Sequence, residues 1–124
     1  MSTRCLIVDD SARFLEAART LLERDGIRVV GVARTGTEAL ARVAELVPDL
    51  VLLDVELDGE CGLELAPRLA GTAPSVIVLT STHPLDEMEE LVTAGPARGF
   101  VHKSRLSGQA LRDLLGPEHG HRTR

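Results

Sequence analysis

Four apolar runs in this sequence each lead into residues that can take part in metal or phosphate chemistry. Asp9 and Asp10 follow the first run, Asp54 the second, Thr80 the third and Lys103 the last. Taken singly, each residue has an ordinary explanation as a helix cap, a turn residue or a solvated charge. The carboxyl ends of parallel strands meet at one edge of a sheet, so we expect all these side chains to project toward one rim.

Carboxylates that lie close together repel one another, so at neutral pH either one keeps its proton or a cation lies among them. Oxygen ligands suit Mg²⁺, and no His or Cys belongs to this set to favour zinc. In phosphoryl transfer the protein mainly supplies positioning and positive charge, which Mg²⁺, Lys103 and the Thr80 hydroxyl can provide. A carboxylate can attack phosphorus to give an aspartyl phosphate, and Asp54 has the most central position for this role.

Five short segments have the composition of strands. The runs Cys5–Val8, Leu50–Leu53 and Val76–Leu79 are continuously apolar, which is typical of parallel strands covered on both faces. The segments Ile27–Ala33 and Gly99–His102 carry Arg or His among their apolar residues, so we place them at the edges of the sheet.

Apolar residues at three-and-four spacing predict helices between these strands. Thr35 and Glu38 have the pattern of a capping box, in which each side chain accepts from the other's free amide. The third helix, Leu63–Leu69, is the weakest because it contains Pro67. The other helices are predicted from Phe14, Ala18, Leu21 and Leu22; Leu40, Val43, Ala44 and Val47; Leu85, Met88, Leu91 and Val92; and Ala110, Leu111, Leu114 and Leu115. This alternation predicts an α/β protein with a (βα)5 doubly wound, five-stranded parallel sheet.

The length of 124 residues suits one domain, which we place at 1–115, with a polar tail or the start of a linker at 116–124. The net charge of -5 argues against direct binding of nucleic acid. Cys5 and Cys61 lie outside any CxxC pattern and are interpreted as reduced apolar fillers. The N-terminal apolar run is too short for a signal peptide or a membrane span, so we expect a cytoplasmic protein without membrane contact.

The motifs VDD at 8–10, LLD at 52–54, VLTS at 78–81 and GFVHK at 99–103 resemble the receiver domains of bacterial response regulators, the CheY-like family, in order, spacing and strand context. This resemblance implies the flavodoxin-like strand order 2-1-3-4-5 and a phosphorylation switch of a two-component system. It implies a phosphoacceptor rather than an enzyme, although such a domain can catalyse its own phosphorylation and dephosphorylation. The implied donor is a sensor histidine kinase or a phosphotransfer protein.

The resemblance also assigns roles to single residues. Asp54 is the implied phosphoacceptor. Asp10 binds Mg²⁺ together with Asp54 and the main-chain carbonyl of Glu56, and Asp9 helps directly or through water. Lys103 is implied to pair with the phosphoryl group.

Thr80 and Phe100 are the implied switch residues. Thr80 moves toward the phosphoryl oxygens, and Phe100 turns inward, unless it is ordinary core packing. This change reshapes the face formed by helix 4, strand 5 and helix 5, through which we expect partner binding and a homodimer. Glu56 and Thr82 flank the water approach and are implied to tune the phosphoryl lifetime, although contact with solvent is their simpler role.

Two residues depart from the family pattern. Asp58 stands in the loop after Asp54 where relatives usually carry Pro, so the rigidity of this loop is an open question. Ser104 follows Lys103 where the family commonly has a cis-Pro, so we expect that rigid turn to be absent. The turn at 94–100 is one residue longer than usual. Relatives without this proline include those that precede a LuxR-like helix-turn-helix domain, which implies transcription regulation through a fused output domain.

Three other functions stay open. A degenerate receiver would act only as a protein-interaction module, and Asp58 and Ser104 leave room for it. A Mg²⁺-dependent aspartyl-phosphate phosphatase of the haloacid-dehalogenase kind would need a DxD motif after the first strand, whereas Asp9 and Asp10 are adjacent. A flavodoxin-like FMN binder would need a hydroxyl-rich phosphate loop and an aromatic ring to stack on the flavin, and the sequence has no Trp or Tyr.

Overall fold

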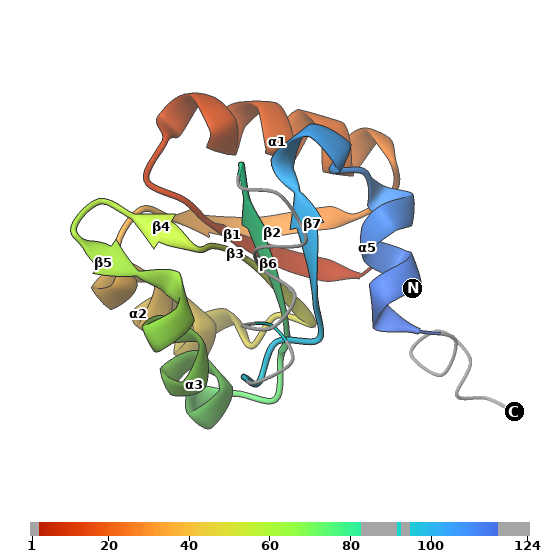
Figure 1. Ribbon diagram of the computed structural model, residues 1–124. Coiled ribbons are helices and arrows are strands. Elements are labelled where there is room, and N and C mark those ends of the chain that lie inside the picture. Colours follow the sequence, from red (N-terminus) through yellow and green to blue (C-terminus); the bar gives the residue numbers. More distant parts are fainter. Residues whose placement is uncertain (1–2, 83–91, 93–94, 117–124) are drawn as a thin grey trace, which may run out of the picture.

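The computed structural model describes residues 3–82, 92 and 95–116, in which a five-stranded sheet is covered by helices on both faces (Figure 1). The elements are β1 (Arg4–Val8), α1 (Ala12–Arg24), β2 (Arg28–Ala33), α2 (Gly36–Leu46), β3 (Leu50–Asp54), β4 (Glu56–Leu57), β5 (Glu60–Cys61), α3 (Gly62–Thr72), β6 (Val76–Ser81), β7 (Gly99–His102), the 3-10 turn η1 (Lys103–Arg105) and α5 (Gly108–Leu115). Of the residues predicted for the fourth helix, Val92 is helical and the others lie outside the described residues.

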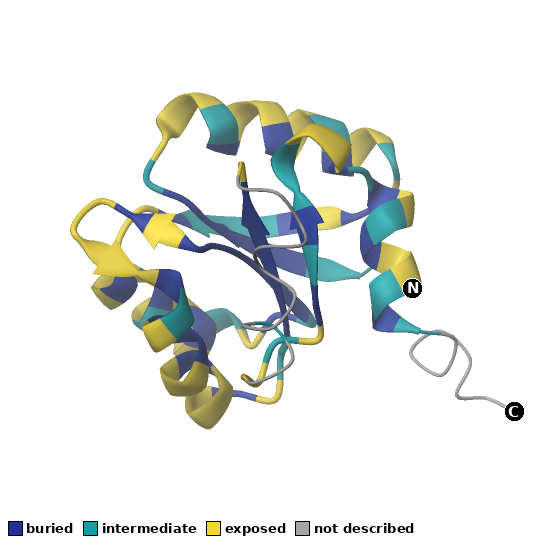
Figure 2. Ribbon diagram, viewed as in Figure 1, coloured by how far each residue is buried: buried dark blue, intermediate teal, exposed yellow. Residues whose placement is uncertain are grey.

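The five long strands are all parallel and lie in the order β2-β1-β3-β6-β7. This confirms the predicted order 2-1-3-4-5, because β6 and β7 are the fourth and fifth strands of that count. The strands with polar residues, β2 and β7, lie at the edges as expected. The central strands are buried on both faces, as the dark ribbon in Figure 2 shows.

Alternate residues of the central strands enter two separate hydrophobic clusters. On β3, Leu50 and Leu52 pack with α1 and α5, whereas Val51 and Leu53 pack with α2 and α3. This alternation follows from the two-residue period of a strand. The continuous apolar runs therefore arise because both faces of the sheet are covered.

Side-chain caps mark three helix starts. The hydroxyls of Ser11, Thr35 and Ser107 accept from main-chain amides at the starts of α1, α2 and α5. The capping box was predicted to include a hydrogen bond from the Thr35 amide to the Glu38 carboxylate, and this partner is wrong. The Glu38 carboxylate instead accepts from the amide of Arg34, one residue earlier, at 2.7 Å. The carboxylate still satisfies a free amide beside the helix start.

Several predicted details of the helices and cysteines are wrong. The helix α3 is longer than the predicted Leu63–Leu69 and accommodates Pro67 within it. Val47, predicted to lie on the apolar stripe of α2, ends that helix in a left-handed conformation and is 48% exposed. Cys5 is buried as expected, but Cys61 is exposed and is no core filler.

The structure also contains a hairpin, β4–β5, that the sequence pattern did not indicate. No described helix is long and apolar enough to cross a membrane.

Candidate functional site

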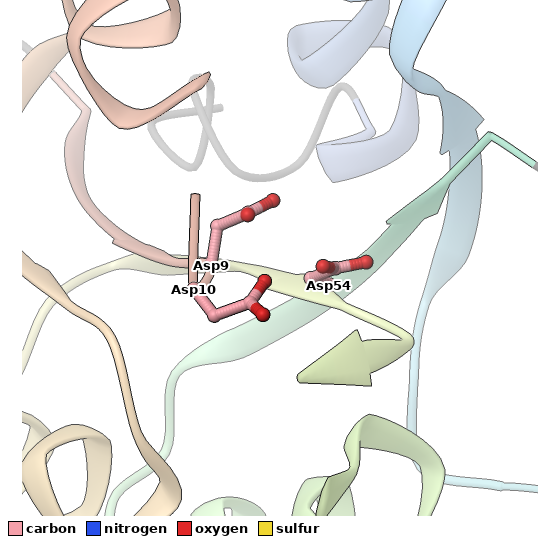
Figure 3. A group of neighbouring side chains, drawn as sticks. All are labelled: Asp9, Asp10 and Asp54. Atoms are coloured by element: carbon pink, nitrogen blue, oxygen red, sulfur yellow. The ribbon is translucent and has the colours of Figure 1, made fainter. Parts of the chain in front are cut away.

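Three carboxylates meet at the carboxyl edge of the sheet. Asp9 and Asp10 follow β1, and Asp54 ends the neighbouring strand β3, so strand pairing alone brings them together. One oxygen from each lies within 4.8 Å of the other two, as Figure 3 shows. The acidic cluster predicted from the sequence therefore forms.

Asp9 is fully buried, and its two carboxylate oxygens have different partners. Oδ1 accepts from the main-chain amide of Ser11 at 2.9 Å, a contact within the turn that leads into α1. Oδ2 accepts no hydrogen bond of regular geometry. It lies 2.7 Å from the Lys103 ammonium, so an ion pair compensates this oxygen.

Lys103 is the only lysine in the sequence and brings its charge into this acidic cluster. Its Nζ lies 2.7 Å from Asp9 Oδ2 and 3.6 Å from Asp54 Oδ2, and its side chain is 19% exposed. The ammonium also lies 4.3 Å from the centre of the Phe14 ring, an attractive cation–π contact. The aromatic ring and the carboxylates thus hold the ammonium at the site.

Asp54 lies in an electrostatically unfavourable position for a charged carboxylate. Burial and, secondarily, the charge of Asp9 raise the pKa of Asp54 from 3.8 to about 6. The amide of Glu56, which donates to Oδ1 at 3.2 Å, and the charge of Lys103 oppose this rise. The single ammonium does not balance the surrounding carboxylates.

Thr80 and Phe100, the predicted switch residues, contact groups other than the carboxylates. Thr80 is fully buried in β6, and its hydroxyl donates to the carbonyl oxygen of Val101 in β7 at 2.8 Å. In this conformation the hydroxyl does not serve the acidic cluster. Phe100, on β7, is half-buried and packs against the cluster beneath α2 and α3. In this structure the contacts of both residues thus lie outside the acidic cluster.

The two residues predicted to tune phosphoryl lifetime are both exposed. Glu56 lies in β4, two residues after Asp54, and Thr82 follows β6. Asp58 is exposed and lines an open groove with Asp10 and Arg34. The side chain of Asp58 is thus open to solvent.

Sequence reasoning missed three residues that support the site. Arg34 donates to the carbonyl oxygen of Asp10 at 3.1 Å. Glu60 of β5 accepts from the amide of Gly36 at 2.7 Å, which ties the loop after Asp54 to the start of α2. Phe14 was assigned only to the helix core. Arg34 directly follows β2, so its place at the carboxyl end of a predicted strand is a signal in the sequence that points to it.

A doubly wound parallel sheet with an acidic cluster and a lysine at the carboxyl ends of its strands places the protein in the CheY-like class of α/β folds. Residues 5–115 match the family model described as the response regulator receiver domain. The chain belongs to this family, as the motifs at its strand ends indicated.

Known proteins of several kinds contain a similar domain. The protein-glutamate methylesterase/protein-glutamine glutaminase 5 of Myxococcus xanthus is 43% identical over 117 residues, which cover 91% of this chain and 34% of the relative. The receiver domain of the putative response regulator NarL from Mycobacterium tuberculosis has a TM-score of 0.80 at 25% identity, covering 94% of this chain and 98% of that one. A LuxR-family response regulator from Aurantimonas sp. SI85-9A1 has a TM-score of 0.80 at 27% identity, covering 93% and 83% of the two chains.

The chain spans only part of the curated relatives that it matches. The alignment covers 34% of the Myxococcus methylesterase and 49% of a putative transcriptional regulator from Pseudomonas aeruginosa. The activities that these names describe belong to those proteins. The shared segment is the receiver domain.

Proposed function

We propose that this chain is a phosphorylation-dependent switch that accepts a phosphoryl group on Asp54 from a histidine kinase or a phosphotransfer protein. One observation carries the proposal. The buried carboxylate of Asp54 has a lysine ammonium 3.6 Å away on one side and two further carboxylates within 4.8 Å. This combines a nucleophile, a fixed positive charge and a set of oxygen ligands at one place.

The donor set fits Mg²⁺. Asp9, Asp10 and Asp54 would supply carboxylate oxygens, and the main-chain carbonyl of Glu56 would complete the protein ligands. Burial and, secondarily, the charge of Asp9 raise the pKa of Asp54, and a divalent cation would offset this concentration of negative charge. When bound, Mg²⁺ would neutralise charge on the transferring phosphoryl group.

Asp54 and Lys103 have different roles in the transfer of the phosphoryl group. An oxygen of Asp54 forms the new P–O bond while the P–N bond of the donor phosphohistidine breaks and its electron pair returns to the imidazole. Lys103 pairs with the phosphoryl oxygens as their charge develops. Asp54 must be ionised to attack, so a cation that lowers its pKa also favours the reaction.

The proposed output begins with Thr80 and Phe100. The Thr80 hydroxyl would leave the carbonyl of Val101 for a phosphoryl oxygen, and Phe100 would turn inward. These movements would reshape the face of β7 and α5, where Phe100, Ala110 and Leu114 line a groove. The fourth helix, expected on the same face, lies almost entirely outside the described residues. This face would carry partner binding and homodimerisation, and a fused output domain would regulate transcription.

Exposed residues beside the site would set how long the phosphoryl group persists. We propose that Glu56 and Thr82 tune this lifetime, since both lie within two residues of a site residue and face solvent. The net charge of -5 favours a domain that does not itself bind nucleic acid, and the proposed location is the cytoplasm.

The first experiment measures a mass increase. Wild-type protein is incubated with acetyl phosphate and Mg²⁺, and intact-mass spectrometry counts the phosphoryl groups added. We expect one addition, which is lost in Asp54→Asn and in the presence of a chelator. A folded wild type that gains no phosphoryl group would instead favour a degenerate receiver that only binds partners.

A phosphatase acting on a separate substrate is the weaker alternative. Asp9 and Asp10 are adjacent rather than two residues apart, and the pairing of Lys103 with Asp9 Oδ2 supports receiver roles for the residues after β1. Turnover of p-nitrophenyl phosphate that requires Asp54 and exceeds one equivalent would support the phosphatase instead.

A further inference from the structure

The imidazole of His102 connects three segments beside Lys103. Its Nε2 lies 2.8 Å from the carbonyl oxygen of Thr82, just after β6. Its Nδ1 accepts from the main-chain amide of Ser104 at 3.1 Å and lies 2.8 Å from the Ser104 hydroxyl. A single ring thus connects the end of β6, the end of β7 and η1, the turn that begins with Lys103.

These contacts determine the tautomer of the ring. The amide of Ser104 can only donate, so Nδ1 must be the unprotonated nitrogen. Nε2 then carries the proton and donates to the carbonyl of Thr82. Both ring nitrogens are satisfied by the neutral form.

The same contacts make His102 the N-cap of η1. A cap of this kind orders the turn because it satisfies a main-chain amide that otherwise has no partner. The amide belongs to Ser104, and a proline at this position would have no amide to donate. Ser104, which stands where the family commonly has a proline, therefore supplies the amide on which this cap depends.

The capped turn begins with the residue whose side chain completes the acidic cluster. Lys103 lies between the capping residue His102 and the capped amide of Ser104. Its ammonium must reach Asp9 Oδ2 at 2.7 Å and Asp54 Oδ2 at 3.6 Å. The side chain is long and flexible, so the position of its main chain decides how well the ammonium is held.

We propose that His102 is a positioning residue for Lys103, and that with the Ser104 amide it takes over the role of the rigid proline turn. His102 itself does not contact the phosphoryl group. The effect of His102 on phosphoryl binding rests on the proposed function. Its effect on the position of Lys103 in the metal-free protein does not.

The test uses the fact that Lys103 is the only lysine. Lysine labelled with ¹³C and ¹⁵N gives one side-chain signal by NMR in the metal-free protein. The phosphoryl site is then probed with beryllofluoride at saturating Mg²⁺ by ¹⁹F NMR, and Mg²⁺ affinity is measured separately by calorimetry. The variants are His102→Ala, which removes the cap, His102→Asn, whose side-chain oxygen can accept from an amide two residues on, and Ser104→Ala, which keeps the amide.

For His102→Ala we expect a shifted and averaged Lys103 signal, and a beryllofluoride affinity that falls by about fivefold, the size of a typical cap effect. Mg²⁺ affinity should stay within about twofold, because Lys103 is no metal ligand. His102→Asn should recover most of the affinity, and Ser104→Ala should resemble the wild type.

Two results would overturn the inference. One is an unchanged Lys103 signal together with unchanged beryllofluoride affinity in His102→Ala. The other is an equal loss of Mg²⁺ and beryllofluoride affinity that His102→Asn does not repair, which would indicate general loss of structure. If the wild type binds neither probe while the Lys103 signal still depends on His102, the proposed function fails and the positioning role stands.

Discussion

At the scale of single residues, the site is short of positive charge. Asp9 is fully buried and Asp54 nearly so, yet the single ammonium of Lys103 faces both. Burial and, secondarily, the neighbouring charge of Asp9 raise the pKa of Asp54. Two predictions depend on the same excess of negative charge.

The first prediction concerns stability against pH without metal. The pKa of Asp54 is 3.8 in its ordinary state and about 6 in the fold, so between these values the folded state binds more protons. Its contribution to stability is therefore present below pH 4 and is lost as pH rises through 6, by up to about 3 kcal/mol. Asp54→Asn should lack this loss.

Denaturant unfolding in chelator at pH 4 to 8 measures this effect. The free energy of unfolding of Asp54→Asn should exceed that of the wild type increasingly as the pH rises. Saturating Mg²⁺ should stabilise the wild type and leave Asp54→Asn less affected. A constant difference across this range would contradict the electrostatic explanation.

The second prediction removes the ammonium. Lys103→Met keeps much of the side-chain length but leaves Asp9 Oδ2 buried without its cation. We expect the metal-free free energy of unfolding at neutral pH to fall by about 2 kcal/mol, less than for a fully buried pair because Lys103 is partly exposed. Mg²⁺ should recover part of this loss. Equal stability of the variant and the wild type in chelator would contradict the role of the ion pair.

At the scale of elements, the loop after Asp54 is ordered without the usual proline. It forms the hairpin β4–β5 and is tied to α2 where Glu60 accepts from the amide of Gly36. It then enters α3 at Gly62, whose amide donates to the carbonyl of Val55 at 2.6 Å. The hairpin and these contacts give this loop an alternative source of rigidity.

The third prediction tests the close approach at Gly62. A methyl group there would overlap the main-chain carbonyl oxygen of Asp54, and main-chain atoms cannot move aside easily. Gly62→Ala should therefore lower the free energy of unfolding by about 2–3 kcal/mol. Gly71→Ala is the matched control, since it lies in the same helix with open space around it and should stabilise by about 0.5–1 kcal/mol. Equal effects of the two variants would contradict the overlap.

At the scale of the whole molecule, the sheet divides the core into two halves. Leu22 of α1 packs in the half shared with α5, whereas Leu69 of α3 packs in the half shared with α2 (Figure 1). Both side chains are almost completely buried. The sheet between them separates their contacts.

The fourth prediction follows from this division. Leu22→Ala and Leu69→Ala should each cost about 2–5 kcal/mol, and the double variant should show their sum within about 0.5 kcal/mol. Chemical denaturation of both single variants and the double variant measures the coupling. A clearly smaller effect in the double variant would mean that the two half-cores relax together through the sheet.

Some features of the site depend on close approach between segments that are distant in the sequence. The sequence showed a Thr at the end of β6, but only the neighbouring strand reveals that its hydroxyl donates to Val101. The capping pattern identified Glu38, but the path of the chain brings Arg34 to it. Beside the hairpin β4–β5, the Gly62 amide donates to the Val55 carbonyl oxygen and the main chains of Asp54 and Gly62 approach closely, which no local pattern indicates.

Three features could be predicted before the fold was known. The family resemblance indicated the strand order, polar residues indicated the edge strands, and the apolar runs indicated which residues end the strands. These predictions succeed because a parallel strand that is buried on both faces needs an unbroken apolar run. The carboxyl ends of all parallel strands also lie at the same edge of the sheet. The tautomer of His102 and the partner of the Thr80 hydroxyl follow from contacts that form only in the folded chain. Hydrogen bonds form between specific atoms within about 3 Å, a distance that residue types and spacing do not encode.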